Sequence, residues 1–279
     1  MVREQPKKLS VFHSVALYNG VHAEKRKERI RHIMKVIFHS DFYSVYASES
    51  AALPGRMESI AKSLGNKYEI ITAIPADLKD IEAVHTINHI EDVRRRGLYD
   101  ISALAAGGAI QAAELGMKEP AFAAIRPPGH HASPGDSWGF CYFNNMAVAL
   151  TRLMVSGQIK TAAILDFDLH YGDGNVNCIG GPSVRICNPD AHDRKSYLKE
   201  VEYFLNNLKV DIIGISAGFD YHLEDWGGLL ATEDYFTMGQ MVKETAQKLG
   251  AGYFGILEGG YNHKVLGDSC VALLEGMSK

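Results

Sequence analysis

The stretch TAAILDFDLHYGDG, residues 161–174, joins an apolar run to a cluster of acidic and histidine side chains. Its first half is dense in Ala, Ile, Leu and Phe, which predicts a strand over residues 161–167 that is covered on both faces. Similar apolar runs occupy residues 68–73, 121–125, 211–216 and 253–257. The stretch is therefore predicted to be one buried strand of a sheet that includes these runs.

Segments with helical character lie between the predicted strands. They are the Ala-rich residues 102–115, then 145–155, 197–208 after Ser196, and 232–249, which begins with a Thr cap and two acids. Strands and helices alternate as in βαβ units, which predicts an α/β fold with a central, mainly parallel sheet and helices on both faces. Without an internal repeat or a linker-like tract, residues 1–279 are predicted to form a single domain.

The bulk properties exclude several classes of partner. A net charge of -4 gives no attraction to nucleic acid or to an anionic membrane. The four cysteines, at positions 141, 178, 187 and 270, form no C-x-x-C pair, which is typical of a reducing compartment. The polar N-terminal stretch MVREQPKKLS does not resemble a signal peptide, and no apolar run approaches the ~20 residues that span a bilayer. We expect a soluble, cytoplasmic protein with no nucleic acid or membrane partner.

Clusters of polar residues follow four of the predicted strands. They are RPPGHHA at 126–132, DFDLHYGDG at 166–174, AGFDYH at 217–222 and EGGY at 258–261. Open α/β sheets bind ligands at the carboxyl ends of their strands. We therefore expect the four clusters to meet at one site.

Three residues of these clusters suit a metal ion. Asp168 and His170 offer an oxygen and a nitrogen from one extended segment, and Asp220 adds a second carboxylate. Three protein ligands leave room for water and a substrate carbonyl, as in catalytic sites. The ligand set suits zinc, and Fe(II), Mn(II) or Co(II) also fit it. The alternative for D-x-D-x-H taken alone is an ordinary turn in which Asp and His are caps.

The remaining polar residues suit proton transfer and charge stabilisation. His130 and His131 follow a rigid Pro-Pro-Gly turn, and Asp166 and Asp173 are available to orient two imidazoles. Tyr261 follows two glycines, so its hydroxyl can face the metal and stabilise negative charge on an amide oxygen. The alternatives are two surface histidines in a loop and a tyrosine packed at the rim of the sheet.

Five motifs in order resemble those of the histone deacetylase superfamily, which includes acetylpolyamine amidohydrolases and acetoin-utilisation proteins. They are RPPGHHA, GFCYFNN (139–145), LDFDLHYGDG (165–174), SAGFD (216–220) and LEGGYN (257–262), with a weaker echo in LPGRM (53–57). The resemblance implies an arginase-like α/β fold and a deacetylase that acts on amide bonds.

The resemblance also implies roles for individual residues. The metal ligands are Asp168, His170 and Asp220; His130 pairs with Asp166 and His131 with Asp173; Tyr261 polarises the scissile carbonyl; Gly139 and Phe140 line an acyl-chain tunnel. Proton transfer is assigned to His131 and electrostatic support to His130. A potassium ion held by oxygens of the D-x-D-x-H segment is a further expectation.

The sequence departs from the family in ways that bear on the substrate. The segment between His170 and Asp220 is short and lacks the loop that supplies a second aromatic wall, and Tyr171 replaces a histidine common in the family. No loop aspartate that grips a peptide backbone can be located. These features predict an open site, or one completed by a neighbouring subunit of a homo-oligomer. They favour a small N-acetylated amine, such as a polyamine, over an acetyl-lysine protein.

Two alternatives remain. A binuclear manganese ureohydrolase needs a D-x-D motif at the second metal position, whereas Asp220 is followed by Tyr221 and His222. A catalytically idle relative that acts as a binding or scaffold protein is free to lose site residues, whereas every position required for chemistry is filled here. Both comparisons favour a mononuclear metal hydrolase.

Overall fold

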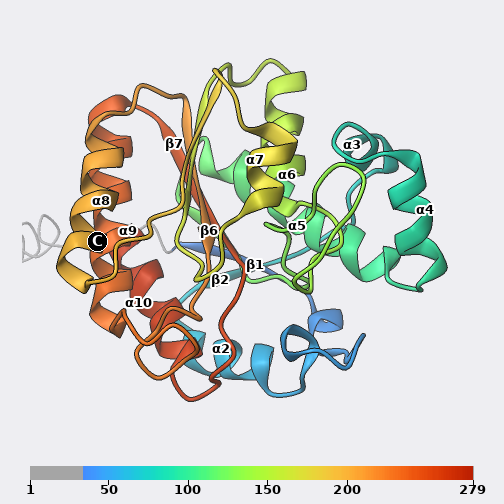
Figure 1. Cartoon of the computed structure of the whole chain (residues 1–279), viewed down its shortest axis with the longest axis horizontal. Coiled ribbons are helices and arrows are strands. Elements are labelled where there is room, and N and C mark those ends of the chain that lie inside the picture. The colour runs from blue at the N-terminus through green and yellow to red at the C-terminus, as the bar shows by residue number, and fades with distance from the viewer. Residues whose placement is uncertain (1–33, 279) are drawn as a thin grey trace, which may run out of the picture. The chain divides into compact units, whose positions relative to one another are not determined.

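A seven-stranded sheet runs through the part of the chain that the computed structural model describes, residues 34–278 (Figure 1). Its strands are β1 (Lys35–Phe38), β2 (Glu69–Thr72), β3 (Ala121–Ala123), β4 (Ala162–Asp166), β5 (Val184–Cys187), β6 (Ile212–Ala217) and β7 (Gly252–Leu257). Their order is β2-β1-β3-β7-β6-β4-β5, and every neighbouring pair is parallel. The prediction of a mainly parallel central sheet is confirmed.

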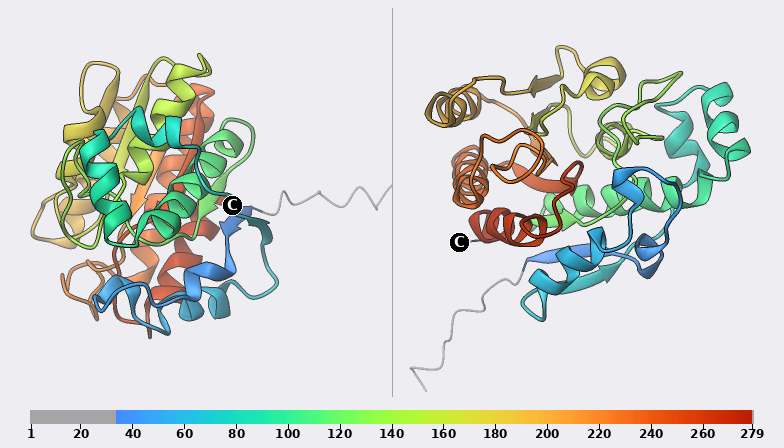
Figure 2. Two further views of the ribbon diagram at one scale, coloured as in Figure 1. Left: turned by 90° about the vertical axis from the view of Figure 1, so that its right-hand side faces the viewer. Right: turned by 60° about the horizontal axis from the view of Figure 1, so that its bottom comes forward.

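Helices cover both faces of this sheet, as predicted. Those of the described residues are α2 (Arg56–Leu64), α3 (Leu78–Glu82), α4 (Ile87–Arg95), α5 (Tyr99–Gly116), α6 (Asn145–Val155), α7 (Asp173–Ile179), α8 (Arg194–Asn206), α9 (Thr232–Leu249) and α10 (Leu266–Ser278), with short 3-10 turns η2 (Ser40–Tyr43) and η3 (Ser50–Ala52). Helices α8, α9 and α10 pack together on one side, and α5 and α6 pack together on the other (Figures 1 and 2).

Local capping explains where the predicted helices begin. Helix α6 has the predicted bounds because Asn144 caps it, accepting a hydrogen bond from the backbone N–H of Ala147. Helix α8 begins at Arg194, earlier than predicted, because the carboxylate of Asp193 accepts the backbone N–H of Ser196. Helix α9 has the predicted bounds, but Thr232 is its first residue and Ala231 occupies the capping position.

Some predicted features were wrong or incomplete. Strand β2 lies at the edge of the sheet and most of its residues are exposed, whereas the run at 68–73 was expected to be covered on both faces. The sequence did not predict β1, β5 or α10, and helix α5 extends beyond 102–115 at both ends.

Residues 1–33 and 279 lie outside the described part of the chain. The expectation about the N-terminal stretch MVREQPKKLS falls there, and a single domain over 1–279 stays a prediction. Within residues 34–278, no helix combines the length and the apolar character that crossing a bilayer requires.

Candidate metal centre and active site

The four polar clusters follow four strands that are neighbours in the sheet. The segments come after β3, β7, β6 and β4, which lie side by side in that order. The carboxyl ends of parallel strands meet at one edge, so the sheet topology itself brings the clusters together. The residues named from the sequence therefore lie within one site, where they contact one another.

The three proposed metal ligands form one group. One ligand atom from each of Asp168, His170 and Asp220 lies within 4.8 Å of the others. The Nδ1 atom of His170 is 3.1 Å from both Oδ1 of Asp168 and Oδ2 of Asp220. This combination of two carboxylates and one imidazole is a set that divalent transition metals accept.

Other atoms of the two carboxylates are held by the backbone. Oδ2 of Asp168 accepts the N–H of Gly259 at 2.8 Å, and Oδ1 of Asp220 accepts the N–H of Leu169 at 3.1 Å. A Cβ on Gly259 would lie 2.5 Å from Asp168 Oδ2, so only glycine fits at this approach. These contacts fix the orientation of the carboxylates.

The fit to a cation is clearest at Asp220. Its Oδ2 is buried and receives no hydrogen bond of good geometry from the described residues, although Nδ1 of His170 lies 3.1 Å away. A buried carboxylate oxygen without a donor is costly, and a bound cation removes that cost. Burial and the adjacent Asp168 raise the pKa of Asp220 to about 7, and the two carboxylates raise the pKa of His170 to about 10. Concentrated negative charge of this kind fits a divalent cation.

Each histidine of the H-H pair contacts the carboxylate expected for it. Nδ1 of His130 lies 3.2 Å from Oδ2 of Asp166, and Nδ1 of His131 lies 2.7 Å from Oδ1 of Asp173. The two imidazole rings are tilted against each other with centroids 4.0 Å apart. Two His-Asp dyads therefore lie side by side; His130–Asp166 is buried, whereas Asp173 of the other dyad is partly exposed.

The pKa values of the two histidines are shifted in opposite directions. Burial and the neighbouring charge of His130 lower the pKa of His131 to about 4. Burial also acts to lower the pKa of His130, but Asp168 and Asp166 outweigh it and raise that pKa well above its usual value. At neutral pH His131 is thus a neutral imidazole. With Nδ1–H donated to Asp173, its Nε2 is left able to accept a proton.

Tyr261 is half-buried among aromatic rings. Its ring is 5.8 Å, centroid to centroid, from the ring of Phe140, in an edge-to-face contact. Burial and the charges of Asp168 and Asp220 raise the pKa of Tyr261 well above its usual value. The phenol therefore keeps its proton at neutral pH and is a hydrogen-bond donor.

Two tryptophans at the site were not identified from the sequence. Trp138 stacks on His131 with ring centroids 3.8 Å apart, and Trp226 stacks on Tyr261 with centroids 4.1 Å apart. Both are about half exposed. The position of Trp138 directly before Gly139 and Phe140 was a usable signal, whereas nothing in the sequence linked Trp226 to Tyr261.

Gly139 and Phe140 have left-handed backbones. Their φ angles are 60° and 68°, and a Cβ on Gly139 would lie 2.3 Å from Cδ2 of His131. The close approach requires glycine, because any side chain would displace the imidazole. Phe140 adopts a conformation that is unfavourable for a bulky residue, which is common at functional sites.

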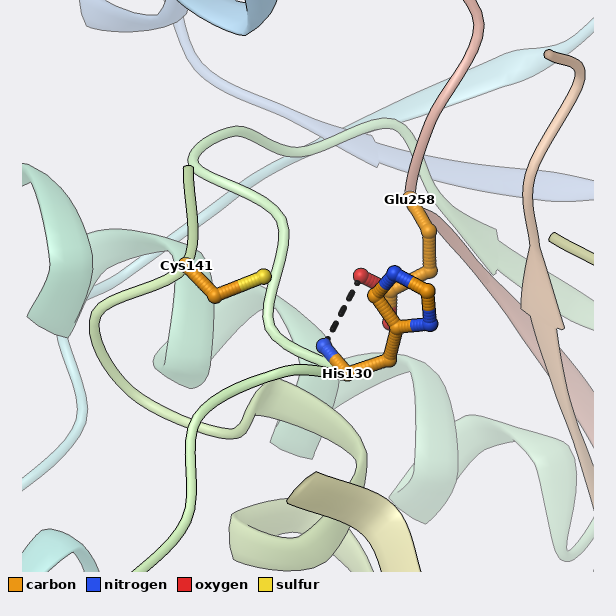
Figure 3. Close-up of side chains that lie close together, drawn as sticks. All are labelled: His130, Cys141 and Glu258. Carbon is orange, nitrogen blue, oxygen red and sulfur yellow. Dashed lines mark hydrogen bonds between the residues drawn. The ribbon is translucent and has the colours of Figure 1, made fainter. Parts of the chain in front are cut away.

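His130 also belongs to a second, buried group of potential ligands, with Cys141 and Glu258 (Figure 3). The carboxylate of Glu258 accepts the backbone N–H groups of Gly129 and His130, and the hydroxyl of Ser216 donates to its other oxygen at 3.3 Å. Burial raises the pKa of the Cys141 thiol well above its usual value, so it stays protonated. These interactions identify the group as the buried support of the 126–132 loop.

Known proteins resemble this chain in sequence and in fold. A family model described as the histone deacetylase domain matches residues 50–197. A probable deacetylase of Archaeoglobus fulgidus is 29% identical over 81% of each chain. A histone deacetylase-like amidohydrolase of Pseudomonas aeruginosa is 24% identical over 83% of this chain and 77% of its own. The crystal structure of an HDA15 HD domain matches the fold with a TM-score of 0.72 and 24% identity, over 87% of this chain and 89% of that one.

Proposed function

The chain belongs to the histone deacetylase family, and from that membership we propose that it is a metal-dependent deacetylase that hydrolyses the N-acyl amide of an amine. The observation that carries the proposal is the group of Asp168, His170 and Asp220, in which a buried oxygen of Asp220 receives no hydrogen bond of good geometry. Zinc suits these ligands, and Fe(II), Mn(II) and Co(II) are the other candidates. A bound potassium ion stays a prediction.

The residues around the group have complementary roles in this reaction. A divalent metal supplies Lewis acidity toward water and a carbonyl oxygen. His131, neutral and oriented by Asp173, takes the proton from the attacking water and returns it to the departing amine. The protonated Tyr261 hydroxyl donates a hydrogen bond to the oxygen that becomes negative. The balance is one amide and one water giving a carboxylate and a protonated amine.

His130 acts as support rather than as the base. Its raised pKa keeps it cationic beside Asp166, in a fully buried position. A fixed positive charge next to His131 keeps the pKa of that imidazole low, so that it remains a proton acceptor at neutral pH. We infer that His130 tunes the electrostatics of the site.

The substrate that we propose is a small N-acetylated amine, such as an acetylated polyamine, or an acetyl-lysine side chain. The short segment between His170 and Asp220 favours the small amine, because it lacks the loop that the family resemblance implies as a second aromatic wall. A homo-oligomer that completes the site stays a prediction.

The alternatives account for fewer observations. A second metal next to Asp220 requires a ligand at position 222, but both ring nitrogens of His222 are engaged, with Thr232 at 3.1 Å and the backbone N–H of Glu224 at 3.0 Å. This argues against a binuclear ureohydrolase. A scaffold protein has no need for two ordered His-Asp dyads beside a metal-ligand group.

The proposal is tested with metal-stripped protein, to which zinc, Fe(II), Mn(II) or Co(II) is added back. The substrates are an acetyl-lysine peptide, acetylputrescine, acetylspermidine and a short acyl ester. We expect metal-restored cleavage of at least one substrate, and the preferred one identifies the class of substrate. Absence of turnover with every metal and substrate would favour the scaffold alternative.

Two variants test the mechanism. His131→Ala and Tyr261→Phe should each lower kcat by about 100-fold or more, because they remove proton transfer and charge stabilisation. Both should keep the wild-type circular dichroism spectrum. Full activity in either variant contradicts the role assigned to that residue.

A further inference from the structure

The loop between β6 and α9 is tied to the loop that carries Tyr261. Oδ2 of Asp225 accepts the backbone N–H groups of Tyr261 and Asn262, each at 2.7 Å. The side-chain amide of Asn262 donates in return to the carbonyl oxygen of Glu224. Hydrogen bonds to an ionised carboxylate are stronger than neutral ones. Asp225 therefore fixes the backbone on which Tyr261 stands.

The next residue fixes the ring. The indole of Trp226 lies on the phenol ring of Tyr261 with centroids 4.1 Å apart and an interplanar angle of 28°. Its own backbone N–H donates to Oδ1 of Asp225 at 2.8 Å, so the two residues act as one unit. The indole also makes an edge contact with His170, with centroids 6.1 Å apart.

Trp226 also supplies an aromatic surface where the sequence predicted that one was missing. The short segment after His170 lacks an aromatic wall, yet Trp226, from the loop after Asp220, is 54% exposed beside both His170 and Tyr261. An exposed indole face next to the metal-ligand group is suited to contact the apolar part of a substrate.

We propose that Asp225 and Trp226 are positioning residues that hold Tyr261 in its reactive orientation, and that Trp226 forms the second aromatic wall of the site. This inference rests on the proposed function, in which the Tyr261 hydroxyl stabilises the developing charge. A displacement of about 1 Å at a reacting group can cost on the order of 100-fold in rate. Asp225 and Trp226, which together we call the clamp, therefore control kcat through Tyr261.

The first experiment is a double-mutant cycle on the full chain loaded with zinc, with an acetyl-lysine peptide as the probe. Asp225→Asn should lower kcat by about 10- to 100-fold with little change in KM. In the Tyr261→Phe background the same substitution should have no further effect, because the group that it positions is already removed. An equal loss in both backgrounds would overturn the proposal.

The matched control is Asp211→Asn. Oδ2 of Asp211 accepts two successive backbone N–H groups, those of Lys160 and Thr161, at 2.7 and 2.9 Å, but at the opposite edge of the sheet. This variant likewise replaces a charged acceptor with a neutral amide and should keep wild-type kcat. A loss of kcat equal to that of Asp225→Asn would show that the effect is merely structural and overturn the proposal.

The wall is tested at Trp226. Trp226→Leu should raise KM for the peptide and lower kcat, because it removes both the aromatic surface and the stack on Tyr261. Trp226→Phe should restore most of both parameters, since a smaller aromatic ring still stacks. Equal kcat and KM for Trp226→Leu and Trp226→Phe would exclude an aromatic role for Trp226.

A fluorescence experiment tests the clamp without turnover. The sequence contains only two tryptophans, so Trp138→Phe leaves Trp226 as the sole indole. Adding Asp225→Asn should increase the quenching of Trp226 by acrylamide and shift its emission to the red, whereas Asp211→Asn should change neither. Unchanged emission after Asp225→Asn overturns the clamp, even if the peptide is not a substrate. Full kcat in Tyr261→Phe alone would instead refute the proposed role of Tyr261.

Discussion

The indole of Trp138 lies against the imidazole of His131, with ring centroids 3.8 Å apart and an interplanar angle of 30°. Its Nε1–H donates to Oδ2 of Asp173 at 2.8 Å, and Oδ1 of the same carboxylate is 2.7 Å from His131 Nδ1. One aspartate thus joins the two rings. Trp138 both covers the imidazole face and orients the carboxylate that orients the imidazole.

Removal of the Trp138 ring should change the pH dependence of catalysis. Burial is the main reason that the pKa of His131 lies at about 4, and Trp138→Leu exposes this imidazole to water. The pKa should rise toward its usual value. Because the neutral imidazole is the reactive form, the acid limb of the kcat/KM profile should move to higher pH. Trp138→Phe, which keeps a stacked ring, should show a smaller shift. An unchanged acid limb in the Leu variant contradicts this explanation.

The close approach of Gly139 to His131 gives a second prediction. Gly139→Ala places a Cβ 2.3 Å from Cδ2 of His131, whereas Gly157→Ala, at a similar φ of 72°, meets no atom within 4 Å. Both variants should lose about 1 kcal/mol of unfolding free energy from the left-handed backbone. Only Gly139→Ala should also lose most of its kcat. Equal activity in the two variants would show that His131 accommodates the methyl group.

The central strands were predictable because their apolar residues form continuous runs separated by lengths of chain that suit a helix. Helix α6 was predictable to the residue because its cap, Asn144, is local. Strand β1 was not, since KVIF is only four residues long and its strand conformation depends on pairing with β2 and β3, which are distant in the sequence. Such pairing is not encoded in any local pattern.

The site was predictable to a similar degree. Its ligands and dyads lie in contiguous motifs, and the parallel sheet brings the motifs together. The supporting contacts were not predictable, because they join single residues of different loops. Asp225 is an ordinary loop aspartate in the sequence, and only the structure shows both of its oxygens occupied by backbone N–H groups, three in all.

Glu258 should contribute to stability rather than to chemistry. It is fully buried and accepts the N–H groups of Gly129 and His130. Glu258→Ala leaves these donors unpaired and should lower the free energy of unfolding by about 2–4 kcal/mol, measured by urea denaturation. Glu258→Gln keeps an acceptor and should cost less. The exposed Glu82→Gln is the control, and should have little effect.

The contribution of Glu258 to the free energy of unfolding should depend on pH. Burial raises the pKa of Glu258 in the folded protein to about 7, so its contribution to stability declines as pH rises from about 4.5 through 7. Glutamine does not ionise. In metal-stripped protein the stability deficit of Glu258→Gln should therefore shrink between pH 5 and pH 8. A deficit that grows over this range would show that the carboxylate is preferentially ionised in the folded state.

Metal binding should release protons, because the candidate ligands hold them in the metal-free protein. Asp168 and Asp220 raise the pKa of His170 to about 10, and burial raises that of Asp220 to about 7, whereas a metal needs both groups deprotonated. The apparent affinity for zinc should therefore rise about tenfold per pH unit between pH 7.5 and 9, and more steeply below pH 7. Calorimetry in two buffers of different ionisation enthalpy measures the released protons directly. Asp220→Asn should bind zinc more weakly, and its affinity should no longer change more steeply with pH below pH 7. Asp211→Asn should match the wild type. Zinc affinity that is independent of pH would mean that the metal binds elsewhere.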